Sequence, residues 1–146
     1  MVTVGRMTEE DIVQLARLET VCFGLLAWTE QGLRDELTNE TAHFFVIKED
    51  GVIAGYIGTF VVCESCYVSN IAVFPEMRRK GYAARLISAA ADNARSLGAQ
   101  SVSLEVRPSN SAALSLYASA GFEEIGLRKG FYREPKEDAL ILSLSL

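Results

Sequence analysis

The sequence has no apolar run that approaches the roughly 20 residues needed to cross a bilayer. Its start, MVTVGRMTEEDIVQLARLE, turns acidic at once and lacks the apolar core of a signal peptide. No repeat, low-complexity tract or linker interrupts the chain. We therefore expect a soluble, cytoplasmic protein whose 146 residues form one domain, residues 1–146, with no membrane partner.

Positive charge is also scarce, since 14 Lys and Arg residues face 19 Asp and Glu residues, for a formal charge of -5. A general nucleic-acid-binding protein needs a basic face, so this balance argues against direct contact with nucleic acid. A cationic substrate or partner is compatible with it.

The three cysteines, an odd number, argue against a disulfide scaffold. Cys63 and Cys66 have the spacing of a metal knuckle, but a structural zinc site needs about four ligands. Only Cys22 and His43 could complete the set, and neither is close in sequence. We expect no metal site and two thiols that face each other across a hairpin turn; redox sensing is the alternative.

The first 40 residues predict a strand at Val2–Arg6 and two helices. Thr8 can cap the first helix, with Asp11 three residues later as a variant capping box. The second helix is expected to begin at Thr29. The apolar face of the first helix is predicted to consist of Ile12, Leu15, Ala16, Leu18 and Val21.

A sequence of three antiparallel strands should follow. The apolar segments 43–49 and 52–62 flank Asp50-Gly51, a pair that favours a tight hairpin turn. Glu64-Ser65 marks a second reversal before the strand CYVSNIAVF, residues 66–74.

After Pro75 the apolar period changes to that of a helix with one buried stripe, formed by Ala83, Leu86, Ile87, Ala90, Ala94 and Leu97. Gly98 stands where such a helix would end. A strand at 101–106, a short helix at 110–120 and two final strands complete the chain. One strand–helix–strand crossover after a meander predicts an α/β (α+β) fold with a mixed sheet of about seven strands and about four helices.

The segment Arg78-Arg79-Lys80-Gly81-Tyr82-Ala83 joins a strand to the long helix. Free N–H groups at a helix start bind anions, and cationic side chains there are unfavourable unless an anion accompanies them. Gly81 allows close backbone approach, small Ala83 and Ala84 leave room, and Arg79 and Lys80 can add charge. The pattern indicates a phosphate site; an ordinary solvated basic turn is the alternative.

This segment fits Q/R-x-x-G-x-G/A, the motif with which GNAT-superfamily acetyltransferases hold the pyrophosphate of acetyl-CoA. With SNIAVFPEMR before it, the chain resembles that superfamily along nearly its whole length. LEVRPSNSAALSLYASAGF and KEDALILSL are most similar to the RimI-type ribosomal-protein-alanine N-acetyltransferases. The resemblance implies the GNAT fold, acetyl-CoA as cosubstrate, and cofactor contacts by Ile71, Ala72, Val73, Arg79, Lys80, Gly81, Tyr82, Ala83, Ala84 and Asn110.

Two side chains could perform proton transfers. Glu105 ends an apolar strand and could accept a proton, although it could equally pair with Arg107 on the same strand face. Tyr117 could donate to a thiolate or be a core aromatic, and Asn110 could simply cap its helix. The resemblance assigns Glu105 as the base and Tyr117 as the acid, with a main-chain N–H such as that of Val73 polarising the thioester.

An N-terminal amine is the easier acceptor to deprotonate. With pKa values near 7.7–8.0 and 10.4, roughly one α-amine in ten but about one lysine in 2,500 is neutral at pH 7. The resemblance implies the N-terminal alanine of a small-subunit ribosomal protein, bound between residues 22–28 and 129–137. Trp28 and Tyr132 would wall this groove, unless they are ordinary loop packing. A small-molecule amine or a lysine side chain is the alternative acceptor, and a module that binds acetyl-CoA without turnover is a third interpretation.

Overall fold

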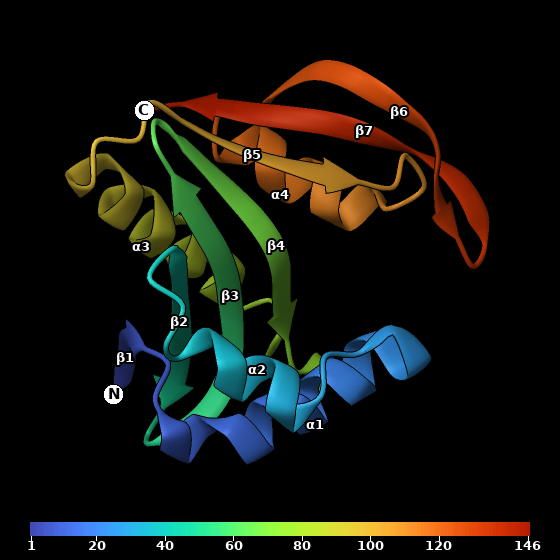
Figure 1. Cartoon of the computed structure of the whole chain (residues 1–146). Helices are drawn as coiled ribbons and strands as arrows, with labels where there is room; N and C mark the ends of the chain where they lie inside the picture. Colours follow the sequence, from blue (N-terminus) through green and yellow to red (C-terminus); the bar gives the residue numbers. More distant parts are fainter.

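A computed structural model describes residues 1–146 as one mixed sheet of seven strands in the order β1-β2-β3-β4-β5-β7-β6 (Figure 1). β4 and β5 are the one parallel pair, and the other neighbours are antiparallel. The mixed sheet that the sequence predicts is thus confirmed. The strands are β1 (Val2–Arg6), β2 (Ala42–Glu49), β3 (Val52–Val62), β4 (Ser65–Val73), β5 (Ser101–Val106), β6 (Glu123–Arg133) and β7 (Lys136–Ser145).

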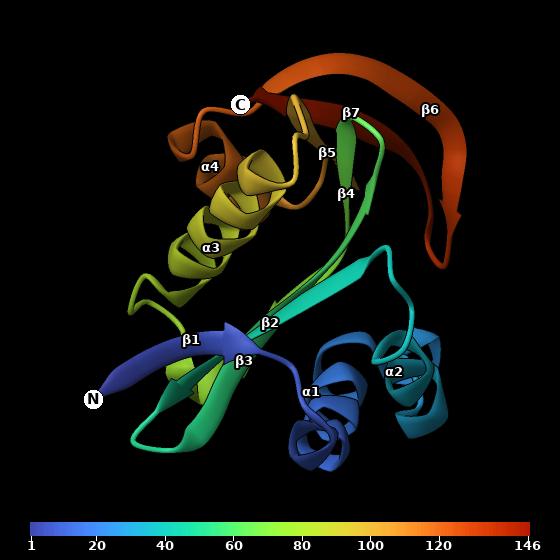
Figure 2. The same ribbon diagram turned by 60° about the vertical axis from the view of Figure 1, so that its left-hand side comes forward.

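Four α-helices cover the two faces of the sheet (Figure 2). α1 (Ile12–Phe23) and α2 (Glu30–Glu36) lie on one face, and α3 (Tyr82–Ser96) and α4 (Ser111–Ser119) on the other. Short 3-10 turns occur at Glu9–Asp11, Gly24–Leu26 and Pro75–Met77. The order of elements is the predicted one.

Each face has its own hydrophobic core. A cluster of 20 buried residues joins α3 and α4 to the sheet, and a cluster of 11 joins α1 and α2 to it.

No single helix is long and apolar enough to span a membrane, whereas Glu9–Leu26 together with Glu30–Glu36, bent by 115° at their junction, would suffice by length and composition alone.

The local signals of the sequence act largely as expected. The Thr29 hydroxyl accepts a hydrogen bond from the Gly32 N–H at 3.0 Å and so caps α2. Asp50 and Gly51 both have positive φ, as a tight hairpin turn of this hand requires. Gly98, with φ of 90°, follows the end of α3 in a left-handed conformation.

Several expectations about burial and pairing are wrong. Val21 is 51% exposed, and Glu19 takes its place as a fully buried residue of α1. Leu97 is likewise about half exposed. The two thiols do not face each other: Cys63 lies exposed in the turn, while Cys66 is buried opposite Val61, because the reversal falls one residue earlier than predicted.

The segment 129–137, expected to form part of the peptide groove, is the end of the hairpin made by the last two strands. β6 continues to Arg133 and β7 begins at Lys136, so that only Glu134 and Pro135 connect them. The register between β6 and β7 shifts between Arg128 and Tyr132, a stretch that contains Gly130, and regular pairing resumes at Tyr132 opposite Glu137. The acceptor wall predicted there is therefore the end of a strand hairpin.

The parallel pair β4–β5 separates soon after it begins. Only Ser65, Cys66 and Tyr67 of β4 pair with β5, opposite Ser101, Val102 and Ser103. Figure 1 shows the two strands diverging from this point. The edge of β4 from Val68 to Val73 that would continue the pairing with β5 is therefore open within the sheet.

Candidate active site

Two clefts flank the place where β4 and β5 diverge. The α3 cleft, about 640 Å³, lies between the end of β4, the head of α3 and α4. The hairpin cleft, about 420 Å³, lies between the α1–α2 connection, β4, β5 and the end of β6. Both are lined by Phe23, Ile71, Asn110, Ala113 and Tyr117, so the clefts meet beside Tyr117.

The head of α3 has the shape of an anion site. Gly81 caps the helix with φ of 79°, and Arg79 also has a positive φ of 66°. A left-handed non-glycine residue is costly, so the loop must hold Arg79 against strain. Arg79 lines the α3 cleft and makes no ion pair, and the first N–H groups of the helix have no partner inside it.

Lys80 departs from the prediction. Its ammonium lies 3.0 Å from Oε1 of Glu49 on β2, and it does not line either cleft. Tyr82 borders the α3 cleft, but its hydroxyl donates to the same Glu49 carboxylate. These contacts lower the pKa of Glu49 and raise the pKa of Lys80. The side-chain cations available to an anion in the α3 cleft are therefore Arg78 and Arg79.

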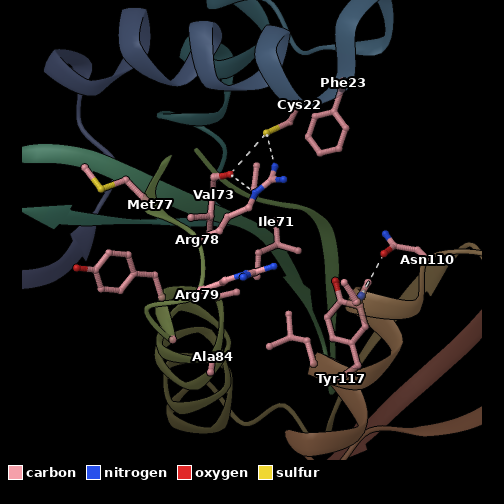
Figure 3. A pocket seen from close by; sticks show the side chains of 17 residues that line it. Cys22, Phe23, Ile71, Val73, Met77, Arg78, Arg79, Ala84, Asn110 and Tyr117 are labelled. Carbon is pink, nitrogen blue, oxygen red and sulfur yellow. Dashed lines mark hydrogen bonds between the residues drawn. The ribbon is translucent and has the colours of Figure 1, made fainter. Parts of the chain in front are cut away.

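Arg78, the first residue of the motif, to which the sequence analysis assigned no contact, binds the edge of β4. Its Nε donates to the Val73 carbonyl at 3.1 Å, and the Cys22 thiol also faces that oxygen at 3.8 Å (Figure 3). The N–H of Phe74 donates to Ala54 on β3, so strand alternation turns the N–H of Val73 toward the open edge. Burial raises the pKa of Cys22, which disfavours the thiolate that a nucleophile would need.

The open edge of β4 and α4 form opposite walls of the α3 cleft. Ile71, Ala72 and Val73 line it from the strand, Ala83 and Ala84 from α3, and Asn110 and Tyr117 from α4. The Asn110 side chain caps α4 by accepting from the Ala113 N–H at 3.1 Å. Predicted cofactor residues other than Lys80 thus come together here.

Tyr117 is buried, and its ring packs on Phe122 at 5.5 Å between centroids. Burial, with a smaller effect of nearby Tyr132, raises the pKa of Tyr117 to about 12. The hydroxyl makes no hydrogen bond within the protein. With its pKa raised to about 12, the phenol is neutral at pH 7, and its hydroxyl is free to donate to a group placed between the two clefts.

Glu105 lines the hairpin cleft with a side chain only 10% exposed. It does not pair with Arg107: its Oε1 lies 3.3 Å from Nε of Arg128 on β6. Arg107 instead binds the hairpin end, through the Pro135 carbonyl at 2.8 Å and Glu137 at 3.2 Å. The alternative in which Glu105 and Arg107 neutralise each other is thus wrong.

Trp28, just before α2, and Tyr132, near the end of β6, both line the hairpin cleft. The Arg107 guanidinium stacks on the Tyr132 ring at 4.1 Å, which fixes one wall. The Trp28 ring packs edge-on against Phe44. Leu26 and Phe131, both exposed, extend the apolar rim.

Glu19 is the second residue that the sequence pattern missed. Its buried carboxylate accepts from the Trp28 N–H at 2.9 Å, from the Tyr56 hydroxyl at 2.6 Å and from the Asn70 amide at 3.1 Å. Burial raises the pKa of Glu19 in spite of these donors. Since Trp28 and Asn70 line the hairpin cleft, Glu19 ties two of its walls together.

Comparison with known proteins identifies the family to which these two adjoining clefts belong. Residues 11–122 match the family model described as the acetyltransferase (GNAT) family. The chain belongs to the GNAT acetyltransferase family. Members of this family use acetyl-CoA, and the chain is accordingly an N-acetyltransferase.

Individual relatives of this GNAT chain agree with that result. A [ribosomal protein bS18]-alanine N-acetyltransferase of Haemophilus ducreyi is 32% identical, over 98% of this chain and 99% of its own length. The N-alpha-acetyltransferase RimI of Mycobacterium tuberculosis is 34% identical, over 94% and 89%. The crystal structure of the ribosomal-protein-S18-alanine N-acetyltransferase from Escherichia coli superposes with a TM-score of 0.88 at 30% identity, covering 99% of this chain and 94% of that one.

Proposed function

We propose that this enzyme transfers the acetyl group of acetyl-CoA to the α-amine of the N-terminal alanine of a small-subunit ribosomal protein. The observation that carries the proposal is the junction of two clefts beside Tyr117, one with an anion-binding helix start and one with a buried carboxylate. The names of the relatives in Haemophilus ducreyi and Escherichia coli supply the substrate class. A ribosomal substrate would place the reaction in the cytoplasm.

The α3 cleft fits acetyl-CoA. Its pyrophosphate would lie against the N–H groups at the head of α3, with Arg79 beside it, and the role of Lys80 would be limited to its main chain. The pantetheine amides would continue the sheet along Ile71 and Val73, where β5 has turned away. The N–H of Val73, which strand alternation turns toward the open edge, would donate to the thioester oxygen.

The hairpin cleft would take the acceptor. Glu105 would accept the ammonium proton, directly or through water, and the neutral amine would attack the thioester in a ternary complex. Trp28 and Tyr132 would wall the peptide. The Tyr117 hydroxyl would donate to the departing sulfur.

Intact-mass analysis of a defined peptide panel tests the acceptor. A peptide beginning Ala-Arg should gain one acetyl group at its α-amine, while the same peptide with a blocked N-terminus and a free lysine should gain none. Spermidine serves as the small-molecule control. Acetylation confined to lysine side chains or to free polyamine would reject the peptide assignment.

A further inference from the structure

The two oxygens of the Glu105 carboxylate differ in their contacts with the rest of the protein. Oε1 lies 3.3 Å from Nε of Arg128. Oε2 is buried and has no hydrogen-bond partner in the protein. A buried carboxylate oxygen without a partner is costly, and such groups in native proteins call for a reason. Here the unpartnered oxygen belongs to a side chain that lines the hairpin cleft.

The register of the sheet explains why Arg128 is the partner. Glu105 on β5 lies opposite Ile141 on β7, and Ile141 lies opposite Gly126 on β6. Residues opposite each other share a sheet face, as do residues two apart along a strand. Arg128, two residues after Gly126, therefore lies on the same sheet face as Glu105, with β7 between their two strands.

Among the cations near Glu105, Arg128 alone is directed at its carboxylate. Arg107 is held by the hairpin end and by the Tyr132 ring. The phenols of Tyr67 and Tyr132 also face Glu105 as neutral groups: burial raises the pKa of each, and for Tyr67 a hydrogen bond to the Glu105 carboxylate adds to the rise. Arg128 is thus the cation that meets this carboxylate.

We propose that Arg128 is a positioning residue for the acetyl transfer. By holding Oε1, it fixes the rotation of the carboxylate so that Oε2 faces the acceptor ammonium or its bridging water. The inference rests on the proposed role of Glu105 as the base. The orientation of the base is then set by a residue of β6, a strand whose Phe131 and Tyr132 also line the hairpin cleft.

Arg128→Ala and Arg128→Lys test the proposal, with Arg95→Ala as the control. Arg128 and Arg95 are both 57% exposed and both ion-paired, but Arg95 lies on α3 away from the two clefts. With the Ala-Arg peptide, Arg128→Ala should lower kcat roughly tenfold, as expected for side chains coupled by an ion pair, with KM and acetyl-CoA affinity changed less than about twofold. Arg128→Lys should recover part of the loss, and Arg95→Ala should lose nothing.

A double-mutant cycle separates positioning from a general structural effect. In a Glu105→Gln background, Arg128→Ala should cause little further loss of kcat, since its target is gone. A crystal structure of Arg128→Ala should show the Glu105 carboxylate rotated or in more than one conformer. An unchanged kcat, an equal loss in both backgrounds, or an unmoved Glu105 would overturn the inference.

The same experiment keeps the inference apart from the proposed function. If the wild-type enzyme fails to acetylate the peptide, the peptide assignment fails. The cycle is then run with whichever amine of the panel is acetylated, and the crystal structure of Arg128→Ala needs no acceptor. Either result still decides whether Arg128 sets the geometry of Glu105.

Discussion

Replacing Tyr117 by Phe removes one oxygen atom from the junction of the two clefts. The ring and its contact with Phe122 are kept, and the lost hydroxyl makes no hydrogen bond within the protein. Folding stability should therefore change by less than about 1 kcal/mol, and acetyl-CoA affinity should be preserved.

The size of the kinetic effect follows from the pKa of Tyr117, about 12. A thiol has a pKa near 8.5, so full proton transfer from this phenol to a thiolate would be uphill by roughly 5 kcal/mol. Tyr117 should thus act by donating a hydrogen bond to the developing charge on sulfur. Such bonds to charged groups contribute about 1.5–3 kcal/mol, which corresponds to a loss of kcat of about 10- to 150-fold.

The assay is release of free thiol with the Ala-Arg peptide, measured from pH 6 to pH 10. Tyr82→Phe is the matched control, because it also removes a phenol hydroxyl at the α3 cleft, but one that is turned toward Glu49. Since Tyr117 stays protonated below about pH 12, the wild-type kcat profile should have no basic limb attributable to it in this range. A kcat of Tyr117→Phe within threefold of the wild-type value would refute the reasoning.

Three further outcomes concern stability. Burial raises the pKa of Glu19 above 4.5, so the folded state binds more protons than the unfolded chain just above pH 4.5. The stability of the wild type relative to Glu19→Gln should therefore fall as the pH rises, by up to about 1.4 kcal/mol per pH unit, until the pH passes the pKa of the folded state. Urea unfolding midpoints of both proteins from pH 4 to pH 8 measure this fall. Gly55→Ala would place a Cβ 2.6 Å from the Ala72 carbonyl, so we expect a loss of about 1–3 kcal/mol, and a wild-type melting temperature would contradict the close strand approach. Burial and Arg6 lower the pKa of His43 below 6.5, so stability should rise with pH through the window below 6.5, and His43→Gln should flatten that slope.

The sequence predicts the fold well because its signals are local. The Asp50-Gly51 turn, the Thr29 cap and the spacing of apolar residues in α3 each act within a few positions of the chain. Together with strand-length apolar segments they determine the order of elements. The anion site proposed before α3 could be predicted for the same reason, since the residues that suggest it are consecutive.

What the sequence did not reveal are contacts between residues that are distant in sequence. Lys80 turns to Glu49, 31 residues away, and leaves the cleft where its sequence neighbours lie. Glu105 takes Arg128 in place of Arg107, because the adjacent arginine is captured by the hairpin end. Periodicity also gave no sign of the buried Glu19, whose donors come from β3, β4 and the connection before α2.

The open stretch of β4 has a consequence for how the protein behaves in solution. An unpaired strand on the outside of a sheet can recruit strands of other chains and seed aggregation. Here the unpaired main-chain groups lie in the interior of the sheet, between two strands that are still joined at one end by Ser65 to Tyr67. To extend the sheet at that place, a strand of a second protein would have to insert between β4 and β5. The unpaired main-chain groups of β4 are thus protected from the edge-to-edge pairing that an outermost strand allows.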